Sequence, residues 1–120
     1  MKHEMKLRHA PFLAIKSGEK SIEMRLYDEK RSRIKTGDTI VFTDIDTGKT
    51  LRCLVTALYT YANFDALYRA HDKISIGYKK DERADPKDML AYYAPSDIER
   101  YGVVAIEIKP IADNEGGENG

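Results

Sequence analysis

Residues 18–27 read Gly-Glu-Lys-Ser-Ile-Glu-Met-Arg-Leu-Tyr, and this stretch has the clearest strand pattern in the chain and holds the candidate functional residues. Apolar and polar side chains alternate along it with a period of two, which predicts a strand that buries one face and leaves the other polar. The buried set is Ile22, Met24 and Leu26, and the polar set is Ser21, Glu23, Arg25 and Tyr27. Gly18 is typical of the residue that ends a helix, so a short helix is expected just before this strand.

The segments on both sides predict more strands and a few short helices. Further strands are expected at residues 5–9, 39–43, 50–61 and 102–108. Short helices are expected to begin near Pro11, Asn63, Pro86 and Pro95. The last strand is apolar at nearly every position and should lie in the middle of the sheet. Because hairpins dominate and no βαβ unit repeats, we expect an α+β fold, a small and mostly antiparallel β-barrel with short helices packed around it.

Length and charge limit the organisation of the chain. Its 120 residues are the size of one domain, and 20 Lys and Arg balance 20 Asp and Glu. A net charge of zero argues against a basic clamp for long nucleic acid. Residues 1–110, however, hold 20 bases against 17 acids, because the three charged residues of residues 111–120 are all acidic. We expect one domain over residues 1–110 and a disordered acidic tail over residues 111–120.

Several classes of protein are disfavoured by composition. A single cysteine, Cys53, allows no internal disulfide and no cysteine zinc site, and the three histidines are scattered, so neither a metal nor another cofactor is expected. No apolar run approaches the roughly 18 residues of a membrane span, and no secretory signal is visible near Met1. We expect a cytoplasmic protein without a membrane partner, present as a monomer or a weak homodimer.

Lys20, Glu23 and Arg25 are the candidate functional residues. Residues two apart on a strand lie roughly 6.5–7 Å apart on the same face, so Glu23 and Arg25 share a surface that Lys20 borders. Arg25 offers a planar fork to a phosphate, a carboxylate or a base edge. Glu23 can accept from an amine or act as a base, and a desolvated Lys20 can act as a catalytic amine. The alternative is a solvent-facing strand with a weak Glu–Arg pair.

Bases and tyrosines form a second pattern. Residues 16–35 hold seven bases and four acids, and seven tyrosines follow later in the chain. These are Tyr59, Tyr61, Tyr68, Tyr78, Tyr92, Tyr93 and Tyr101. Bases with exposed aromatic rings suit single-stranded nucleic acid, whereas half-buried tyrosines would belong to the core.

Three segments resemble the ASCH domain family, named for activating signal cointegrator homology, whose fold is similar to the PUA RNA-binding barrel. Gly18 to Arg25 resembles the G-x-K-x-x-E-x-R signature of this family. Residues 34–42, Ile-Lys-Thr-Gly-Asp-Thr-Ile-Val-Phe, resemble its I-K-x-G-D-x-I-x-F turn and strand, and residues 101–108 resemble its closing strand. The resemblance covers about residues 5–110 and implies a PUA-like barrel with a cleft whose floor carries the signature residues.

The resemblance also implies a function, with RNA or a modified nucleoside or nucleotide as the partner. The ligand-binding residues are then expected to be Lys20, Ser21, Glu23, Arg25 and Tyr101. Some relatives hydrolyse the acetyl amide of N4-acetylcytidine and others are ribonucleases, which implies an alternative, a metal-independent hydrolase with Lys20 and Glu23 as catalytic residues. In the amidohydrolase-like relatives a threonine stands at the position of Glu23, and Glu82 is one candidate for their later glutamate. A protein-interaction adaptor is a third alternative, although no exposed apolar stripe is visible.

Overall fold

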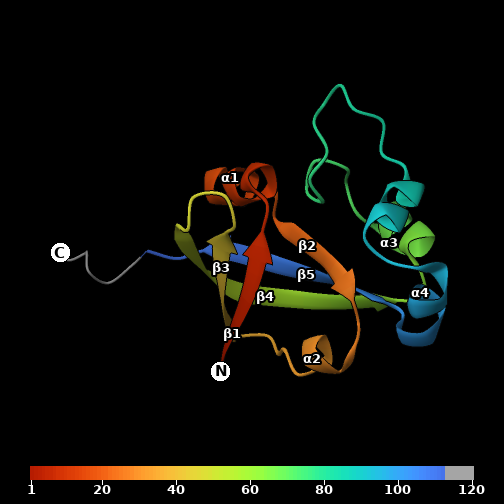
Figure 1. Ribbon diagram of the computed structural model, residues 1–120, viewed down its shortest axis with the longest axis horizontal. Coiled ribbons are helices and arrows are strands. Elements are labelled where there is room, and N and C mark those ends of the chain that lie inside the picture. The colour runs from red at the N-terminus through yellow and green to blue at the C-terminus, as the bar shows by residue number, and fades with distance from the viewer. Residues whose placement is uncertain (113–120) are drawn as a thin grey trace.

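The computed structural model describes residues 1–112, so residues 113–120 of the expected tail lie outside the described part. Five strands form one curled sheet, shaped like a half-barrel, with short helices around it (Figure 1). The strands are β1 (Lys2–Leu7), β2 (Ile22–Leu26), β3 (Thr39–Asp44), β4 (Thr50–Tyr61) and β5 (Val103–Pro110). The helices are α1 (His9–Ser17), α2 (Glu29–Ser32), α3 (Phe64–Ala70), the 3₁₀ helix η1 (Pro86–Ala91) and α4 (Pro95–Tyr101). The expected α+β class is confirmed.

The sheet is mixed, so the expected mostly antiparallel barrel is wrong. Its strand order is β1-β3-β4-β5-β2, and β1 runs parallel to β3 while the other three neighbouring pairs are antiparallel. The chain passes from β1 at one edge through α1 to β2 at the other edge, and then returns to place β3 beside β1. The parallel pair results from this crossing, which a hairpin cannot make.

Two hydrophobic cores lie on opposite faces of the sheet, and the apolar side chains of β2 belong to the second of them. One core packs α1 against the sheet through Phe12, Ile15 and Phe42. The other packs Met24 against Phe64 and helices α3 and η1. Because residues on the polar side of β2 are also covered, the expected half-buried strand is wrong, and so is the alternative of a solvent-facing strand.

The closing strand, β5, lies where its apolar sequence predicts. It pairs with β4 on one side and β2 on the other, and residues 103–106 are fully buried. A strand buried on both faces needs apolar side chains at successive positions, which explains the loss of alternation there.

Two carboxylates at the two ends of β3 hold the N-terminal segment beside it. Asp38 contacts the Met1 ammonium at 3.2 Å and His3 Nε2 at 2.8 Å, and Asp44 contacts His9 Nδ1 at 2.6 Å. The His3 hydrogen bond, with a backbone N–H, lowers the pKa of Asp38 to about 2. Burial raises the pKa of Asp44, but its hydrogen bonds, chiefly with His9, outweigh burial and lower it to about 2. These contacts hold the start of β1 and the start of α1 beside β3.

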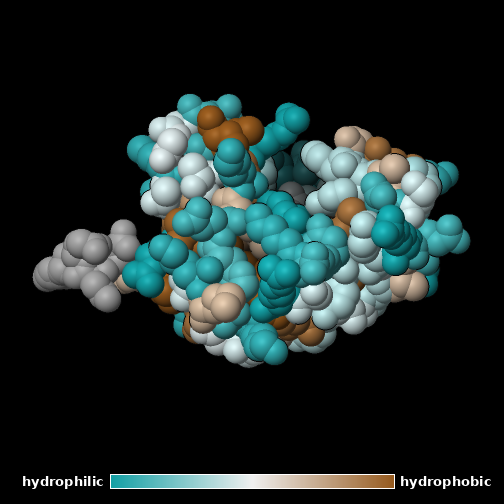
Figure 2. Space-filling model, turned by 60° about the horizontal axis from the view of Figure 1, so that its bottom comes forward, coloured by the Kyte–Doolittle hydropathy of each residue, from teal (hydrophilic) through white to brown (hydrophobic). Residues whose placement is uncertain are grey.

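The described residues were compared with what a membrane protein, a metal protein and an adaptor would need. Among residues 1–112 no helix has the length and hydropathy of a membrane span. In the same part of the chain no group of three or more His, Cys, Asp or Glu side chains could hold a metal ion. The face shown in Figure 2 is mostly hydrophilic, with hydrophobic residues in separate spots, so this face gives no support to the adaptor alternative.

Candidate functional site

The junction of α1 and β2 positions the candidate residues. Gly18 ends α1 as expected, with a left-handed φ of 90° and its N–H donating to Ile15 O at 3.1 Å. The Lys20 N–H then donates back to Ala14 O at 3.0 Å. On the other side, the Ile22 N–H donates to Ser75 O at 2.9 Å. Lys20 is therefore held between the end of α1 and the segment around Ser75.

Lys20, Glu23 and Arg25 converge in one buried group, which we call the charged trio. Lys20 Nζ lies 3.0 Å from Glu23 Oε1, and Arg25 Nε donates to Glu23 Oε2 at 2.6 Å. Only 9% of Lys20 and 5% of Glu23 is exposed. Each carboxylate oxygen is thus engaged by one cation, which leaves the trio with a formal charge of +1.

The charge state of Glu23 is set by its two partners. Burial alone raises the pKa of Glu23, but the adjacent Lys20 and Arg25 outweigh burial and lower it below its ordinary value of 4.5. Glu23 is therefore an ionised carboxylate at neutral pH, and its first role is to hold two cations in place inside the protein.

A glycine in the following loop covers the Lys20 side chain. Gly77 has a φ of 114°, and a Cβ atom at this position would lie 3.2 Å from Lys20 Cδ and 3.4 Å from Nζ. A glycine is needed because the backbone comes this close to Lys20 and adopts a left-handed conformation. The contact fixes the lysine stem from the side opposite to α1.

The charged trio lines a cleft of about 1170 Å³. Helix α1 and β1 form one side of it, and the loop from Ile74 to Glu82 with η1 forms the other, on both sides of the start of β2 (Figure 1). Arg25 also spans the cleft, because its guanidinium donates to Lys6 O on β1 at 3.0 Å. Six bases and five acids line the cleft, so its formal charge is only +1.

Tyrosines that sequence reasoning had not assigned to the site form one wall of the cleft. Tyr68 and Tyr78 lie with their hydroxyl oxygens 2.9 Å apart, and the Tyr78 hydroxyl also donates to Asp88 Oδ2 at 2.7 Å and Asp85 O at 3.1 Å. Both of the latter groups can only accept, so the Tyr78 hydrogen is directed to them. The Tyr68 hydroxyl must then donate to Tyr78, which leaves its lone pairs as acceptors.

The other residues expected at the site lie elsewhere or have other partners. Ser21 is tied by its backbone to Ser75 O and to the N–H of Ile108, and does not line the cleft. Tyr101 lines a separate pocket at the end of α4. Glu82 does line the cleft, but its carboxylate accepts from the Lys79 N–H at 2.7 Å. The ligand-binding roles of Ser21 and Tyr101 stay predictions.

Comparisons with known proteins agree with the signature. A family model described as the ASCH domain matches residues 5–112. The crystal structure of hypothetical protein PH0355 is 36% identical with a TM-score of 0.79, covering 92% of this chain and all of that one. The solution NMR structure of protein PF0455 from Pyrococcus furiosus is 34% identical with a TM-score of 0.74, covering 94% of this chain and all of that one. No curated protein matches. The resemblance drawn from the signature is confirmed, and the chain belongs to the ASCH domain family.

Proposed function

We propose that the chain binds a nucleotide, free or within single-stranded RNA, in the cleft beside the charged trio. The observation that carries this proposal is the burial of Lys20 and Glu23, with Arg25 partly covered beside them, in a cleft that also has a tyrosine wall. Burying three charges is costly for stability, so a group of this kind is typical of a functional site.

The hydrogen-bond inventory of the trio favours a ligand with oxygen acceptors. Lys20 has three N–H donors and Arg25 has five. Among the described residues, one donor of Lys20 is used on Glu23, and Arg25 uses one on Glu23 and one on Lys6 O. The remaining donors suit a phosphate or a carbonyl oxygen of a nucleobase.

The tyrosine wall favours a ligand that also carries an amino group. Both oxygens of Glu23 already accept from cations, so Tyr68, whose hydroxyl donates to Tyr78, is the better acceptor for an exocyclic amine. A base such as cytosine, with a carbonyl on one edge and an amine beside it, matches donors and acceptors placed on two walls. The small formal charge of the cleft fits a nucleotide or a short single strand better than a long duplex.

We predict that Lys20→Gln weakens binding of cytidine monophosphate by about ten-fold or more, because a hydrogen bond from a charged donor is lost. Calorimetric titration at low salt measures this, and Lys16→Gln on the exposed side of α1 is the matched control. In a salt series with single-stranded RNA, the same variant should show a shallower salt dependence if Lys20 contacts a phosphate. Wild-type protein without affinity for RNA or nucleotides, or a Lys20 variant that binds as wild type does, contradicts the proposal.

A hydrolase is the second candidate function, because the Glu23 carboxylate lies 3.0 Å from Lys20 Nζ and is within reach to accept a proton from it. The same samples, incubated with N4-acetylcytidine and with RNA, report acetate release or strand cleavage. Turnover that disappears in Lys20→Gln supports catalysis at this site. Turnover that persists in the variant excludes Lys20 as the catalytic amine.

We also predict that Tyr68→Phe reduces the preference for cytidine over uridine monophosphate. The phenylalanine keeps the ring but removes the acceptor, so only the ligand with an amine loses a hydrogen bond, an effect of about five-fold. Titration of both nucleotides into wild type and variant measures the ratio. An unchanged ratio would mean that Tyr68 does not read the amine.

A further inference from the structure

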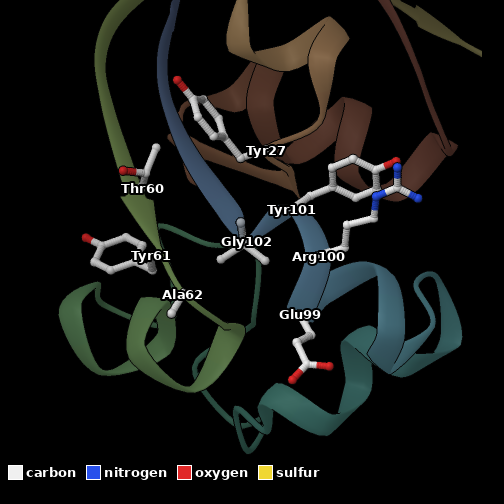
Figure 3. Close-up of a pocket in the computed structure, with 9 residues that line it drawn as sticks. Tyr27, Thr60, Tyr61, Ala62, Glu99, Arg100, Tyr101 and Gly102 are labelled. Carbon is white, nitrogen blue, oxygen red and sulfur yellow. The ribbon is translucent and has the colours of Figure 1, made fainter.

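A second, smaller pocket of about 470 Å³ lies at the far end of β2, beyond the charged trio. It is formed where β2 ends, β4 ends, and α4 leads into β5. Figure 3 shows three of its tyrosines, Tyr27, Tyr61 and Tyr101, on different sides of Gly102. None of these tyrosines lines the first cleft, so the pocket is a distinct site.

The backbone at Gly102 shapes the bottom of this pocket. Gly102 has a φ of 70°, and a Cβ atom there would lie 2.9 Å from Tyr61 O. The Tyr27 N–H donates to Gly102 O at 3.0 Å, which ties the end of β2 to the start of β5. The three tyrosines are therefore carried by backbone segments that are packed tightly against one another.

Two of the tyrosines in the pocket are partly open to solvent, and the third is fixed by a hydrogen bond. Tyr27 is 38% exposed and Tyr101 is 37% exposed. The Tyr61 hydroxyl is hydrogen-bonded to His71 Nε2 at 2.8 Å, which fixes its ring. The Arg100 guanidinium lies 5.1 Å from the centroid of the Tyr101 ring. Held aromatic rings with an arginine beside them are what stacking of a nucleobase requires.

Charge narrows the class of ligand for the pocket. Its charged lining residues are Glu99 and Arg100, so its formal charge is zero. A phosphate would find little attraction there, whereas a flat, neutral aromatic group would gain contact with the tyrosine rings. A nucleobase fits this description.

The two sites lie close enough along β2 to take parts of one ligand. Arg25 belongs to the trio, and Tyr27 is two residues further along, which places their Cα atoms roughly 7 Å apart on an extended backbone. We propose that the pocket of Tyr27, Tyr61 and Tyr101 is a second subsite, which stacks a base of a single-stranded RNA whose other nucleotide occupies the cleft. This inference rests on the proposed function and makes the ligand an oligonucleotide, not a free nucleotide.

The test compares a mononucleotide with a tetranucleotide on wild-type protein and variants. We expect wild type to bind a single-stranded RNA tetranucleotide more tightly than cytidine monophosphate. Tyr27→Ala and Tyr101→Ala should each lower the affinity for the tetranucleotide by about ten-fold and leave the affinity for cytidine monophosphate unchanged. Tyr101→Phe keeps the ring and should retain tetranucleotide affinity. Leu13→Ala, at a side chain that is 47% exposed and lines neither site, is the control.

The outcomes separate this inference from the proposed function. The second subsite is overturned if wild type binds both ligands with equal affinity, or if the tyrosine variants bind the tetranucleotide as wild type does. In either case, binding of cytidine monophosphate still supports the proposed site in the cleft. Absence of binding to either ligand overturns both. A tyrosine variant that changes the sedimentation behaviour of the protein, with RNA affinity unaltered, would identify the pocket as a contact between two copies and overturn the subsite.

Discussion

Glu23→Ala is expected to destabilise the fold by about 3–5 kcal/mol, the largest effect of any single substitution in the charged trio. The variant removes the carboxylate that lies 3.0 Å from Lys20 Nζ and 2.6 Å from Arg25 Nε. Two cations with little exposure would then face each other without a counter-charge. Urea denaturation followed by circular dichroism measures the loss.

Glu23→Gln separates the charge of this side chain from its shape. The amide fills the same space but carries no charge, so we expect a smaller loss than for alanine. It should also change the response to acid. Because the pKa of Glu23 is lowered in the folded protein, its contribution to stability is complete above the unfolded value near 4.5 and is lost as pH falls through the folded value.

In the glutamine variant this part of the acid dependence should be absent, so the difference in stability from wild type shrinks as pH falls below about 4.5. Denaturation curves at a series of pH values compare the two proteins. Leu13→Ala, at an exposed position on α1, controls for a general effect of substitution. A Glu23→Ala protein as stable as wild type at neutral pH would show that the carboxylate does not compensate the two cations.

Gly102→Ala is expected to cost about 2–4 kcal/mol, for two independent reasons. Gly102 has φ 70° and ψ −172°, a backbone conformation that is nearly restricted to glycine. An alanine Cβ would also lie 2.9 Å from Tyr61 O, and a backbone carbonyl in β4 cannot move away without disturbing the pairing of Tyr61 with Val103.

Gly48→Ala is the comparison, because it brings a positive φ without a steric contact. Gly48 lies in the turn between β3 and β4 with a φ of 78°, but nothing lies within 4 Å of its Cβ position. Its substitution should lower the free energy of unfolding by only about 1–2 kcal/mol, because only the left-handed backbone conformation disfavours a side chain there. Thermal unfolding of both variants measures the difference. Equal losses would mean that the contact with Tyr61 O is not a constraint.

The strands and their approximate limits could be predicted from the sequence, but the order of the strands could not. Alternation identified β2, and unbroken apolar sequence placed β5 in the middle of the sheet, because both patterns are local. The parallel pairing of β1 with β3 depends on the long return of the chain across the sheet, and no local pattern near Met5 or Leu7 encodes that partner.

The charged trio could be identified from one octapeptide, while its burial and its surroundings could not. The i, i+2 spacing places Glu23 and Arg25 on one face, but the cover over that face comes from α1 and from the loop around Gly77. Residues 72–85 carry no periodic pattern, so the sequence did not show that Tyr78 meets Tyr68 and forms a wall of the cleft with it. A glycine between Ile76 and Tyr78 was the one visible sign of a close backbone approach.

The position of β2 at an edge of the sheet has a consequence for association between copies of the chain. An edge strand invites another strand to pair with it, and inward-pointing charges are one of the ways in which proteins prevent this. Glu23 and Arg25 point inward from β2, and Ser75 O already takes the N–H of Ile22. A strand from a second molecule would have to displace this loop and lie beside buried charges. The residues proposed to hold the ligand therefore also disfavour pairing between copies of the chain through the β2 edge.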